Sequence, residues 1–506
     1  MDLLNHVIEG FGVALTFQNL LYCLIGCMVG TLIGVLPGIG PVATIAMLLP
    51  LTFKLPPTSA LIMLAGIYYG AQYGGSTTSI LVNLPGEASS VVTTLDGYQM
   101  ARKGRAGAAL SVSALGSFFA GTVGTILIVL FAPALTAMAQ KFGPAEYCSL
   151  MALGLVAAVV LASGSVIKAI VMVFLGLLFG LIGTDVNTGA QRYTFNIPEL
   201  SDGIDFAPIA MGLFGIAEIV GNLEKRMTNR EGAAKITSLL LSMQDFKRSI
   251  GPVLRGTALG SLLGVLPGGG PTLSAFSAYT LEKKLSAKQA AKYGDAFGKG
   301  AIEGVAAPEA ANNAAAQTSF IPMLTLGIPS NAVMALMVGA MIIQGIQPGP
   351  EVMIKKPDLF WGMIASMWIG NAMLVIINLP LIGMWVKLLT VPYRFLYPAI
   401  LLFCCIGAYS LQNSTFHVEQ VALFGVLGYI FMKLGCEGAP FLLGLVLGPQ
   451  MEEYFRRAML LSRGDATVFV TRPISAGLLI VTAILLLIMA LPALRKKRDE
   501  AFQEEG

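Results

Sequence analysis

The chain has 506 residues, of which 12% are charged and 55% are apolar, and its mean hydropathy is +0.76. The charged share is about half that of an ordinary soluble domain, and a soluble protein of this length could not bury so much apolar surface. The net charge of +4 is small for the length. The composition therefore indicates a membrane protein in contact with lipid and gives no sign of nucleic-acid binding.

The apolar residues form long segments that are almost free of charge. Examples are 121–139, 166–181, 365–389, 397–406 and 477–491. They approach or exceed the roughly 20 residues needed to cross a bilayer core. Such segments along the whole chain predict an all-α polytopic membrane protein with about ten to twelve transmembrane helices.

Charged residues between the apolar segments predict the sidedness of the chain. The first ten residues contain Asp2 and Glu9 but no Lys or Arg, so we expect an external N-terminus without a cleavable signal peptide. Basic residues gather at 102–105, 224–250 and 495–498, which should be cytoplasmic, whereas 196–205 is acidic and should be external. The expected parts are a first membrane repeat at 1–223, a basic cytoplasmic linker at 224–250, a second membrane repeat at 251–491 and a cytoplasmic tail at 492–506.

Two phrases occur once in each half of the chain. GTLIGVLPGIGP at 30–41 matches GSLLGVLPGGGP at 260–271 in nine of twelve positions, at an offset of 230 residues. LPGEA at 84–88 resembles IPSNA at 328–332, at an offset of 244. A Pro/Gly break duplicated inside apolar sequence is typical of the binding site of a secondary transporter.

The charge pattern gives the two copies opposite orientations. The first copy follows an N-terminus without bases and the second follows the basic linker, which predicts two inverted repeats. Segments 252–266 and 271–285 are arms of about fifteen residues, too short to span comfortably, and predict a re-entrant hairpin. The alternative is two short tilted helices joined at the surface by a Pro-Gly turn.

The sequence around the breaks is rich in glycine, hydroxyl and amide side chains. Helix N-termini at such breaks suit carboxylates, while Asn and Ser oxygens suit Na⁺. The alternative reading is close helix packing through small residues. A Na⁺ ion is expected near Asn83 and Asn331. The candidate substrate-binding residues are Gly38, Ser76, Thr77, Asn83, Gly86, Ser89, Gly268, Gly269, Pro329, Ser330 and Asn331.

Four acids lie in or near the apolar sequence. Glu87, Glu218, Glu303 and Glu309 are functional candidates, because ionisable groups at membrane depth are costly. Glu87 and Glu309 each follow a Pro and could instead stabilise the first turn of a helix. The candidate cation-coupling residues are Glu87, Glu303, Glu309, Asn312 and Asn313.

Enzymatic chemistry finds little support in the sequence. His6 and His417 are its two histidines, so there is no HExxH motif and no histidine cluster for a metal. The LPGGGP phrase lacks the GKS/T of a nucleotide-binding P-loop. We therefore expect no enzyme activity and no cofactor other than Na⁺ as a coupling ion.

Four segments resemble the large membrane subunit of the tripartite tricarboxylate transporter family. They are GVLPGIGP at 34–41, NLPGEASSVVTTLDGYQMARKGRAGAAL at 83–110, GVAAPEAANNA at 304–314 and LGIPSNAVMALMVGAMIIQGIQPGP at 326–350. The resemblance implies a multi-pass protein of the bacterial inner membrane that takes up citrate-like carboxylates on an ion gradient. It also implies a small four-helix membrane subunit and a periplasmic solute-binding protein as partners.

Analogy with carboxylate carriers that have paired hairpins suggests an elevator. Segments 12–110 and 251–350 would form the moving transport part, and 111–223 and 358–491 the scaffold. The expected function is secondary active uptake of a small tri- or dicarboxylate, delivered by the binding protein and driven by a Na⁺ or H⁺ gradient. The alternative is a passive anion channel or a membrane scaffold that does not transport.

Overall fold

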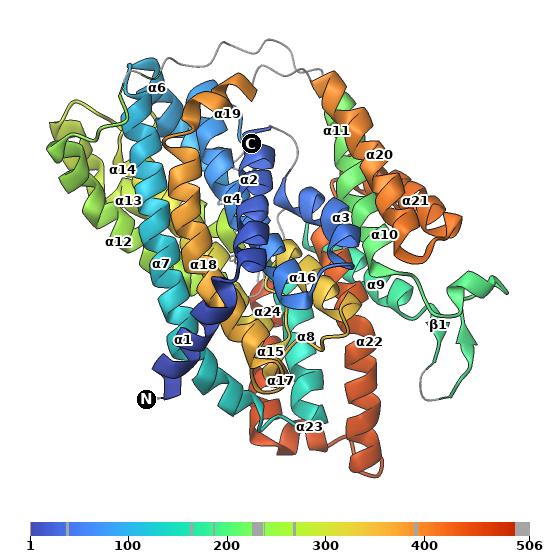
Figure 1. The fold of residues 1–506 in the computed structure, drawn as a ribbon. Coiled ribbons are helices and arrows are strands. Elements are labelled where there is room, and N and C mark those ends of the chain that lie inside the picture. The colour runs from blue at the N-terminus through green and yellow to red at the C-terminus, as the bar shows by residue number, and fades with distance from the viewer. Residues whose placement is uncertain are drawn as a thin grey trace.

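Helices make up nearly all of the regular structure. The computed structural model describes residues 2–36, 40–161, 165–185, 188–224, 236, 238–266, 270–388 and 393–490. Within these ranges, strands occur only as a short antiparallel hairpin, in which Gly183 of β1 (Gly183–Thr184) lies opposite Arg192 of β2 (Gln191–Arg192). Figure 1 shows this hairpin projecting from the side of the helical body. The fold is therefore all-α apart from this hairpin, as the sequence predicts.

The first half of the chain, up to the basic linker, runs from α1 to α11. In chain order they are α1 (Asp2–Ala14), α2 (Phe17–Val35), α3 (Pro41–Thr52), α4 (Pro57–Val82), the 3-10 turn η1 (Ala88–Ser90), α5 (Val91–Thr93), the π-helical turn η2 (Thr94–Tyr98), α6 (Gln99–Arg102), α7 (Ala106–Ala139), α8 (Pro144–Leu161), α9 (Val166–Gly180), the 3-10 turn η3 (Pro198–Leu200), α10 (Phe206–Ala210), the π-helical turn η4 (Met211–Ile216) and α11 (Ala217–Glu224). The segments from α10 to α11 follow each other without a gap, so they form one continuous helix with a π-helical turn inside it.

The second half begins with a pair of long helices. The elements are α12 (Met243–Val265), α13 (Gly270–Lys292), α14 (Glu303–Thr318), α15 (Phe320–Leu326), α16 (Ala332–Ile343), α17 (Pro350–Lys355), α18 (Pro357–Asn378), α19 (Ile382–Leu388), α20 (Tyr393–Gln412), α21 (Thr415–Lys433), α22 (Gly438–Leu461), α23 (Val468–Thr471) and α24 (Pro473–Ala490). The arms α12 and α13 have 23 residues each and exceed the predicted fifteen. Helix α12 begins before Pro252 and continues through it, and Arg255 forms a bidentate ion pair with Glu282 between the arms, at 2.7 and 2.9 Å.

Four helices are long and apolar enough to cross a membrane by length and composition alone. They are α2, Ala106–Met138 of α7, α18 and α21. Six shorter apolar helices accompany them, among the described residues. A twelve-residue helix such as α16 rises only about 18 Å, less than a bilayer core, because the apolar sequence is broken at its start. The count of ten to twelve spans therefore stays a prediction.

A row of glycines joins α2 to α4, and the same contact joins α12 to α14. A Cβ added to Gly30 would lie 2.4 Å from the carbonyl oxygen of Ile67, and one added to Gly260 would lie 2.2 Å from that of Ala311. The glycines are 230 residues apart and their partners 244, which are the offsets of the two repeated phrases. The full set of glycine–carbonyl pairs is Gly26–Met63, Gly30–Ile67, Gly34–Ala71, Gly256–Ala307, Gly260–Ala311 and Gly264–Ala315.

Each half also breaks its central helix in the same way. Asn83 ends α4 with φ 57°, and Gly327 ends α15 with φ 76°, both in the left-handed region. Four residues later, Glu87 (φ −151°, ψ 169°) and Asn331 (φ −155°, ψ 176°) stand in extended backbone immediately before a new helical segment. The two repeated phrases thus adopt matching backbone at matching positions.

The helices form two packed groups. In the first group α7 packs on α14, α18 packs on α4, and α7 and α18 lie side by side (Figure 1). In the second group α9 packs on α22, and α21 packs on η4 and α11. Contact between the groups involves α3, which packs on α20 and η4, and α16, which packs on α22.

The packing of α7 and α18 differs from the expected division into transport part and scaffold. That division placed most of both helices with the scaffold, whereas they pack against the motif-bearing helices. The close approach uses Gly121 and Gly124 of α7, where an added Cβ would meet Asn371 of α18 at 2.1 Å and Gln317 of α14 at 2.8 Å. The apolar pattern alone could not show which neighbours these helices choose.

Candidate functional site

Both breaks and the starts of α3 and α13 meet at one cavity of ≈ 500 Å³. This volume lies within the range of small-molecule sites. We call it the substrate cavity. Its lining includes Gly40, Pro41, Pro271 and Thr272 at the starts of α3 and α13, Pro85, Gly86, Glu87 and Asn331 at the breaks, and Tyr68, Gln72, Phe214 and Glu218 on the walls.

Three helices begin at the substrate cavity. Pro41 opens α3, Pro271 lies in the first turn of α13, and Ala332 opens α16, while the short turn η1 begins at Ala88 beside them. Proline suits a first helical turn because its φ is preset and its missing N–H would have no partner there. The unpaired N–H groups and helix dipoles of these ends favour an anion. Among the described residues, no Lys or Arg lines this cavity.

Asn331 fixes the start of α16 and also faces the cavity. Its Oδ1 accepts a hydrogen bond from the Met334 N–H at 3.0 Å, which caps the helix. Its Nδ2 donates to the hydroxyls of Tyr68 at 3.3 Å and Ser319 at 3.2 Å. The amide is therefore held in one orientation, with the cavity beside it.

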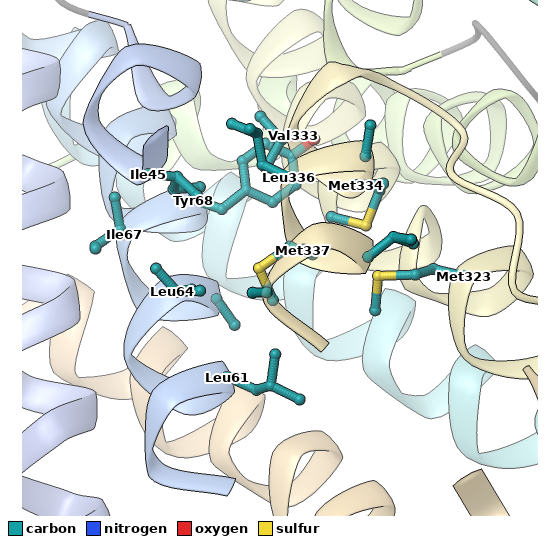
Figure 2. Close-up of a cluster of buried hydrophobic side chains, with 14 of the residues drawn as sticks. Ile45, Leu61, Leu64, Ile67, Tyr68, Met323, Val333, Met334, Leu336 and Met337 are labelled. Atoms are coloured by element: carbon teal, nitrogen blue, oxygen red, sulfur yellow. The ribbon is translucent and has the colours of Figure 1, made fainter. Parts of the chain in front are cut away.

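An apolar cluster supports this side of the cavity. Figure 2 shows Leu64 and Tyr68 of α4 facing Leu336 and Met337 of α16. All four side chains are buried. The cluster sets the distance between α4 and the start of α16, and so positions Tyr68 next to Asn331.

Glu87 connects the cavity to polar groups in the interior. Its carboxylate accepts a hydrogen bond from the Ser89 hydroxyl, which also lies 2.7 Å from Oε1 of Gln72. Asn312 Nδ2 donates to the same Ser89 hydroxyl at 3.4 Å. These contacts link the break after α4 to the middle of α14.

Glu309 lies at the buried end of this network. Its carboxylate accepts hydrogen bonds from the hydroxyls of Ser76, Thr93 and Ser113, the last at 3.1 Å. The Glu309 side chain is fully buried, and none of its described partners is a Lys or Arg. An ionised carboxylate at such a place is costly unless a cation or a proton joins it, and hydroxyl and amide oxygens are suitable ligands for Na⁺. We call Glu309 with these three hydroxyls the Glu309 cluster.

Asn313 holds the side-chain amide of Asn312 in place. Its Nδ2 donates to Asn312 Oδ1 at 2.7 Å, to Ser117 Oγ at 2.8 Å and to the Glu309 carbonyl at 3.1 Å. It therefore acts on the site through Asn312, and it does not line the substrate cavity.

The structure sorts the residues predicted from sequence into groups. Gly86, Glu87 and Asn331 line the cavity, and Ser76, Ser89, Glu309, Asn312 and Asn313 form the network behind it. Thr77, Asn83, Pro329 and Ser330 do not line it. Gly38, Gly268 and Gly269 lie outside the described residues.

The residues that do not reach the cavity have other contacts. The Thr77 hydroxyl donates back to the Tyr73 carbonyl at 3.4 Å, and that of Ser330 donates to the Ser319 carbonyl at 3.4 Å. Asn83 is exposed at the left-handed end of α4, a position that Asn tolerates well. Asn83 therefore does not line the cavity that Asn331 faces.

Two expectations for the acids need correction. Glu303 accepts a bidentate contact from Arg248, at 2.8 and 2.9 Å, and both side chains are buried. It is therefore half of an internal ion pair, away from the cavity. Glu309 is not in a first helical turn, because α14 begins at Glu303 and continues through Pro308.

Sequence reasoning missed several residues that line the cavity. Tyr68 and Phe214 carried no signal beyond lying in apolar segments, and Gln72 was one of many polar side chains in the glycine-rich segment before the first break. Glu218 stood out as an acid in apolar sequence, yet nothing near it in the chain showed where it points. Its carboxylate lies 3.4 Å from the Gly40 N–H, a contact across 178 positions of sequence.

Comparison with known proteins identifies the family of the chain. The family model described as "Tripartite tricarboxylate transporter TctA family" matches residues 20–443. A protein of Agrobacterium vitis described as "Uncharacterized 52.8 kDa protein in TAR-I ttuC' 3'region" is 59% identical over 505 residues, covering all of both chains. Another from the same organism, "Uncharacterized protein in TAR-II ttuC' 3'region", is 61% identical over 246 residues, which are 49% of this chain and all of the relative. No solved structure matches.

The matched family is a family of transporters and not of enzymes. Its model covers the α2–α4 and α12–α14 contacts, both breaks and the substrate cavity. The apolar helices agree with a protein of the membrane. The chain therefore belongs to the tripartite tricarboxylate transporter TctA family as its membrane component.

Proposed function

We propose that this chain carries out secondary active uptake of a small tri- or dicarboxylate across the bacterial inner membrane, driven by Na⁺ or H⁺. The observation that carries the proposal is the convergence of three helix N-termini on one cavity without basic side chains. Backbone N–H groups in such an arrangement bind carboxylate oxygens. The Asn331 amide and the Tyr68 hydroxyl supply further polar contacts.

Charge balance in the cavity supports coupling to a cation. Glu87 and Glu218 face the same space as the anionic substrate. Like charges at close range in a site shielded from water cost several kcal/mol of binding free energy. The substrate therefore binds together with a proton or Na⁺ at Glu87, the carboxylate at the first break. The Glu309 cluster offers a second, buried place for the coupling ion.

The matched contacts of the two halves support inverted repeats and an elevator. The glycine rows and the two breaks recur at constant sequence offsets, and the helices form two groups that meet at α3 and α16. In the proposal one group moves against the other and carries the bound substrate. A small four-helix membrane subunit and a periplasmic binding protein complete the system.

Reconstitution of all three components in proteoliposomes tests the function. With an imposed Na⁺ or pH gradient, the substrate should accumulate above its equilibrium level and the accumulation should collapse with an ionophore. Equilibration without ion dependence would indicate a passive anion channel, and no flux at all a membrane scaffold. A panel of mono-, di- and tricarboxylates in the same assay identifies the substrate class.

A further inference from the structure

A second cavity lies behind the substrate cavity. It has a volume of ≈ 300 Å³ and is lined by Phe214 and Glu218 on one side and by Phe431 and Cys436 on the other. Phe214 and Glu218 also line the substrate cavity. These two side chains therefore form the wall between the two spaces.

The second cavity lies beside the end of the first half of the chain. It is built from α11, α21 and the turn before α22. The end of α11 is tied to the end of α21, because Glu224 accepts hydrogen bonds from Lys433 at 2.5 Å and Tyr429 at 2.9 Å. The basic linker, predicted to be cytoplasmic, starts at this point.

Glu218 has an unusual setting for a carboxylate. Its one hydrogen bond among the described residues comes from the Gly40 N–H at 3.4 Å, and no Lys or Arg lines either cavity. It follows directly on the π-helical turn η4, a distortion that is frequent at functional sites. Gly40 precedes α3, which packs on α4 of the first helix group and on η4 of the second, so this contact lies where the two groups meet.

Few other titratable groups surround Glu218. Glu87 and Tyr68 face it across the substrate cavity, and Cys436 lies across the second cavity. Cys404 of α20 lies beside Gly215, one turn before Glu218, and α3 carries no titratable side chain. A cation that leaves the substrate cavity toward the linker side thus meets Glu218 as the carboxylate on its way.

We infer that Glu218 is a relay site for a monovalent cation, H⁺ or Na⁺, between the substrate cavity and the second cavity. The inference rests on the proposed function. The carboxylate binds the cation that enters with the substrate. Its hydrogen bond from the Gly40 N–H keeps the carboxylate on the substrate side. Movement between the helix groups breaks that contact and leaves the cation open to the second cavity.

Two assays on the complete three-component system separate relay from substrate binding. Substrate exchange, with equal substrate on both sides and no ion gradient, requires the cavity but no net release of the cation. Accumulation on a Na⁺ gradient, or on a pH gradient, requires release. Glu218→Gln should change the exchange rate by no more than about twofold. It should lower accumulation at least tenfold on the gradient of the ion that Glu218 relays, Na⁺ or H⁺. Glu224→Gln, one and a half turns along the same helix, is the matched control and should keep both.

The outcomes distinguish the relay from the function on which it rests. Absence of accumulation by the unchanged protein counts against the proposed function. If that protein accumulates substrate and Glu218→Gln does so equally in both arms, the relay is wrong. Loss of exchange together with accumulation would place Glu218 in the substrate site instead, and would also overturn the relay.

The natural Cys436 provides a test that does not depend on transport. In a variant in which the other five cysteines are replaced, a membrane-impermeant maleimide should modify Cys436 from the cytoplasmic side at least tenfold faster than from the periplasmic side. Equal rates, or faster reaction from the periplasm, would contradict a cytoplasmic outlet through the second cavity.

Discussion

Asn331 combines a structural bond with exposure to the substrate cavity. Asn331→Ala removes both the cap on Met334 and the amide that faces the cavity. Loss of one hydrogen bond to a charged ligand costs roughly 1.5–3 kcal/mol, or about ten- to hundredfold in affinity. We expect the substrate or cation affinity of the reconstituted transporter to fall by this factor, measured from the concentration dependence of uptake.

Two further variants separate the cap from the ligand contact. Asn331→Asp keeps an oxygen that can cap α16, so its stability should stay near that of the unchanged protein while its affinity falls. Met337→Leu alters only the apolar cluster of Figure 2 and should leave affinity unchanged. An Asn331→Ala protein with unchanged affinity for substrate and ion would refute a binding role for this residue.

Ser76 and Thr77 are neighbours in α4 with different surroundings. The Ser76 hydroxyl bonds the Glu309 carboxylate, whereas that of Thr77 bonds the Tyr73 carbonyl of its own helix. Ser76→Ala and Glu309→Gln should each weaken cation dependence, by about tenfold for a single lost bond to a charged group. Thr77→Val should change it much less. Equal effects of Ser76→Ala and Thr77→Val on the Na⁺ or H⁺ dependence of uptake would contradict a role for the Glu309 cluster.

The sequence reveals the site residues that lie at a visible break in a helix. Gly86, Glu87 and Asn331 lie one or two residues after a Pro, so their exposure to a cavity could be predicted. The rotation of α4 about its axis, which separates Ser76 from Thr77, depends on packing against α2 as well as α14. Glu218 comes to the site only because α10–α11 lies next to α3. Such contacts between distant segments leave no local pattern.

At the scale of helices, the glycine rows predict matching effects in both halves. A Cβ at Gly30 or Gly260 would lie within 2.4 Å of a carbonyl oxygen on the facing helix. Gly30→Ala and Gly260→Ala should each force the helices apart and destabilise the protein by about 1–3 kcal/mol or more. Gly12→Ala in α1, where the added Cβ meets nothing within 4 Å, should be neutral or stabilising. Thermal unfolding in detergent measures all three, and a lowered midpoint for Gly12→Ala alone would contradict the packing.

The Arg248–Glu303 ion pair predicts a change in stability and not in coupling. Both side chains are buried, so Arg248→Ala leaves an unpaired carboxylate and should destabilise the protein by about 3–5 kcal/mol. Glu303→Gln should also lower the unfolding midpoint, while the ion dependence of the remaining transport stays the same. The double variant Arg248→Met with Glu303→Gln should recover part of the loss. A changed coupling ratio with normal stability would return Glu303 to the cation-coupling residues.

Helix breaks were predictable where Pro and Gly mark them, but helix lengths and neighbours were not. The repeated phrases correctly located the ends of α2, α12 and the two breaks. Apolar sequence gave no limit for α12 and α13, whose outer turns carry charged residues and whose middles are joined by the Arg255–Glu282 ion pair. The grouping of α7 and α18 with the motif-bearing helices depends on Gly121 and Gly124, whose role appears only once their partners are known.

On the scale of the whole molecule, the two copies of the glycine row start from opposite ends. Helix α2 begins beside α1, at the end of the molecule where the N-terminus lies and opposite to α6 (Figure 1). Helix α12 begins beside α6 and α7, where Asp245 lies 2.6 Å from Arg105 and an added Cβ on Gly107 would meet the Ser238 carbonyl at 1.6 Å. Equivalent helices with opposite directions are what an inverted repeat requires.

Cysteine labelling in intact cells tests this arrangement across the membrane. The expected sidedness comes from charge, because basic segments stay in the cytoplasm. Glu9→Cys and Glu199→Cys should react with an impermeant maleimide added from the periplasm. Lys103→Cys, beside the start of α12, and Arg230→Cys in the basic linker should react only after the inner face is exposed. If Glu9→Cys and Arg230→Cys react from the same face, α2 and α12 enter the membrane from one side and the inverted arrangement is wrong, although the substrate cavity and its transport function would stand.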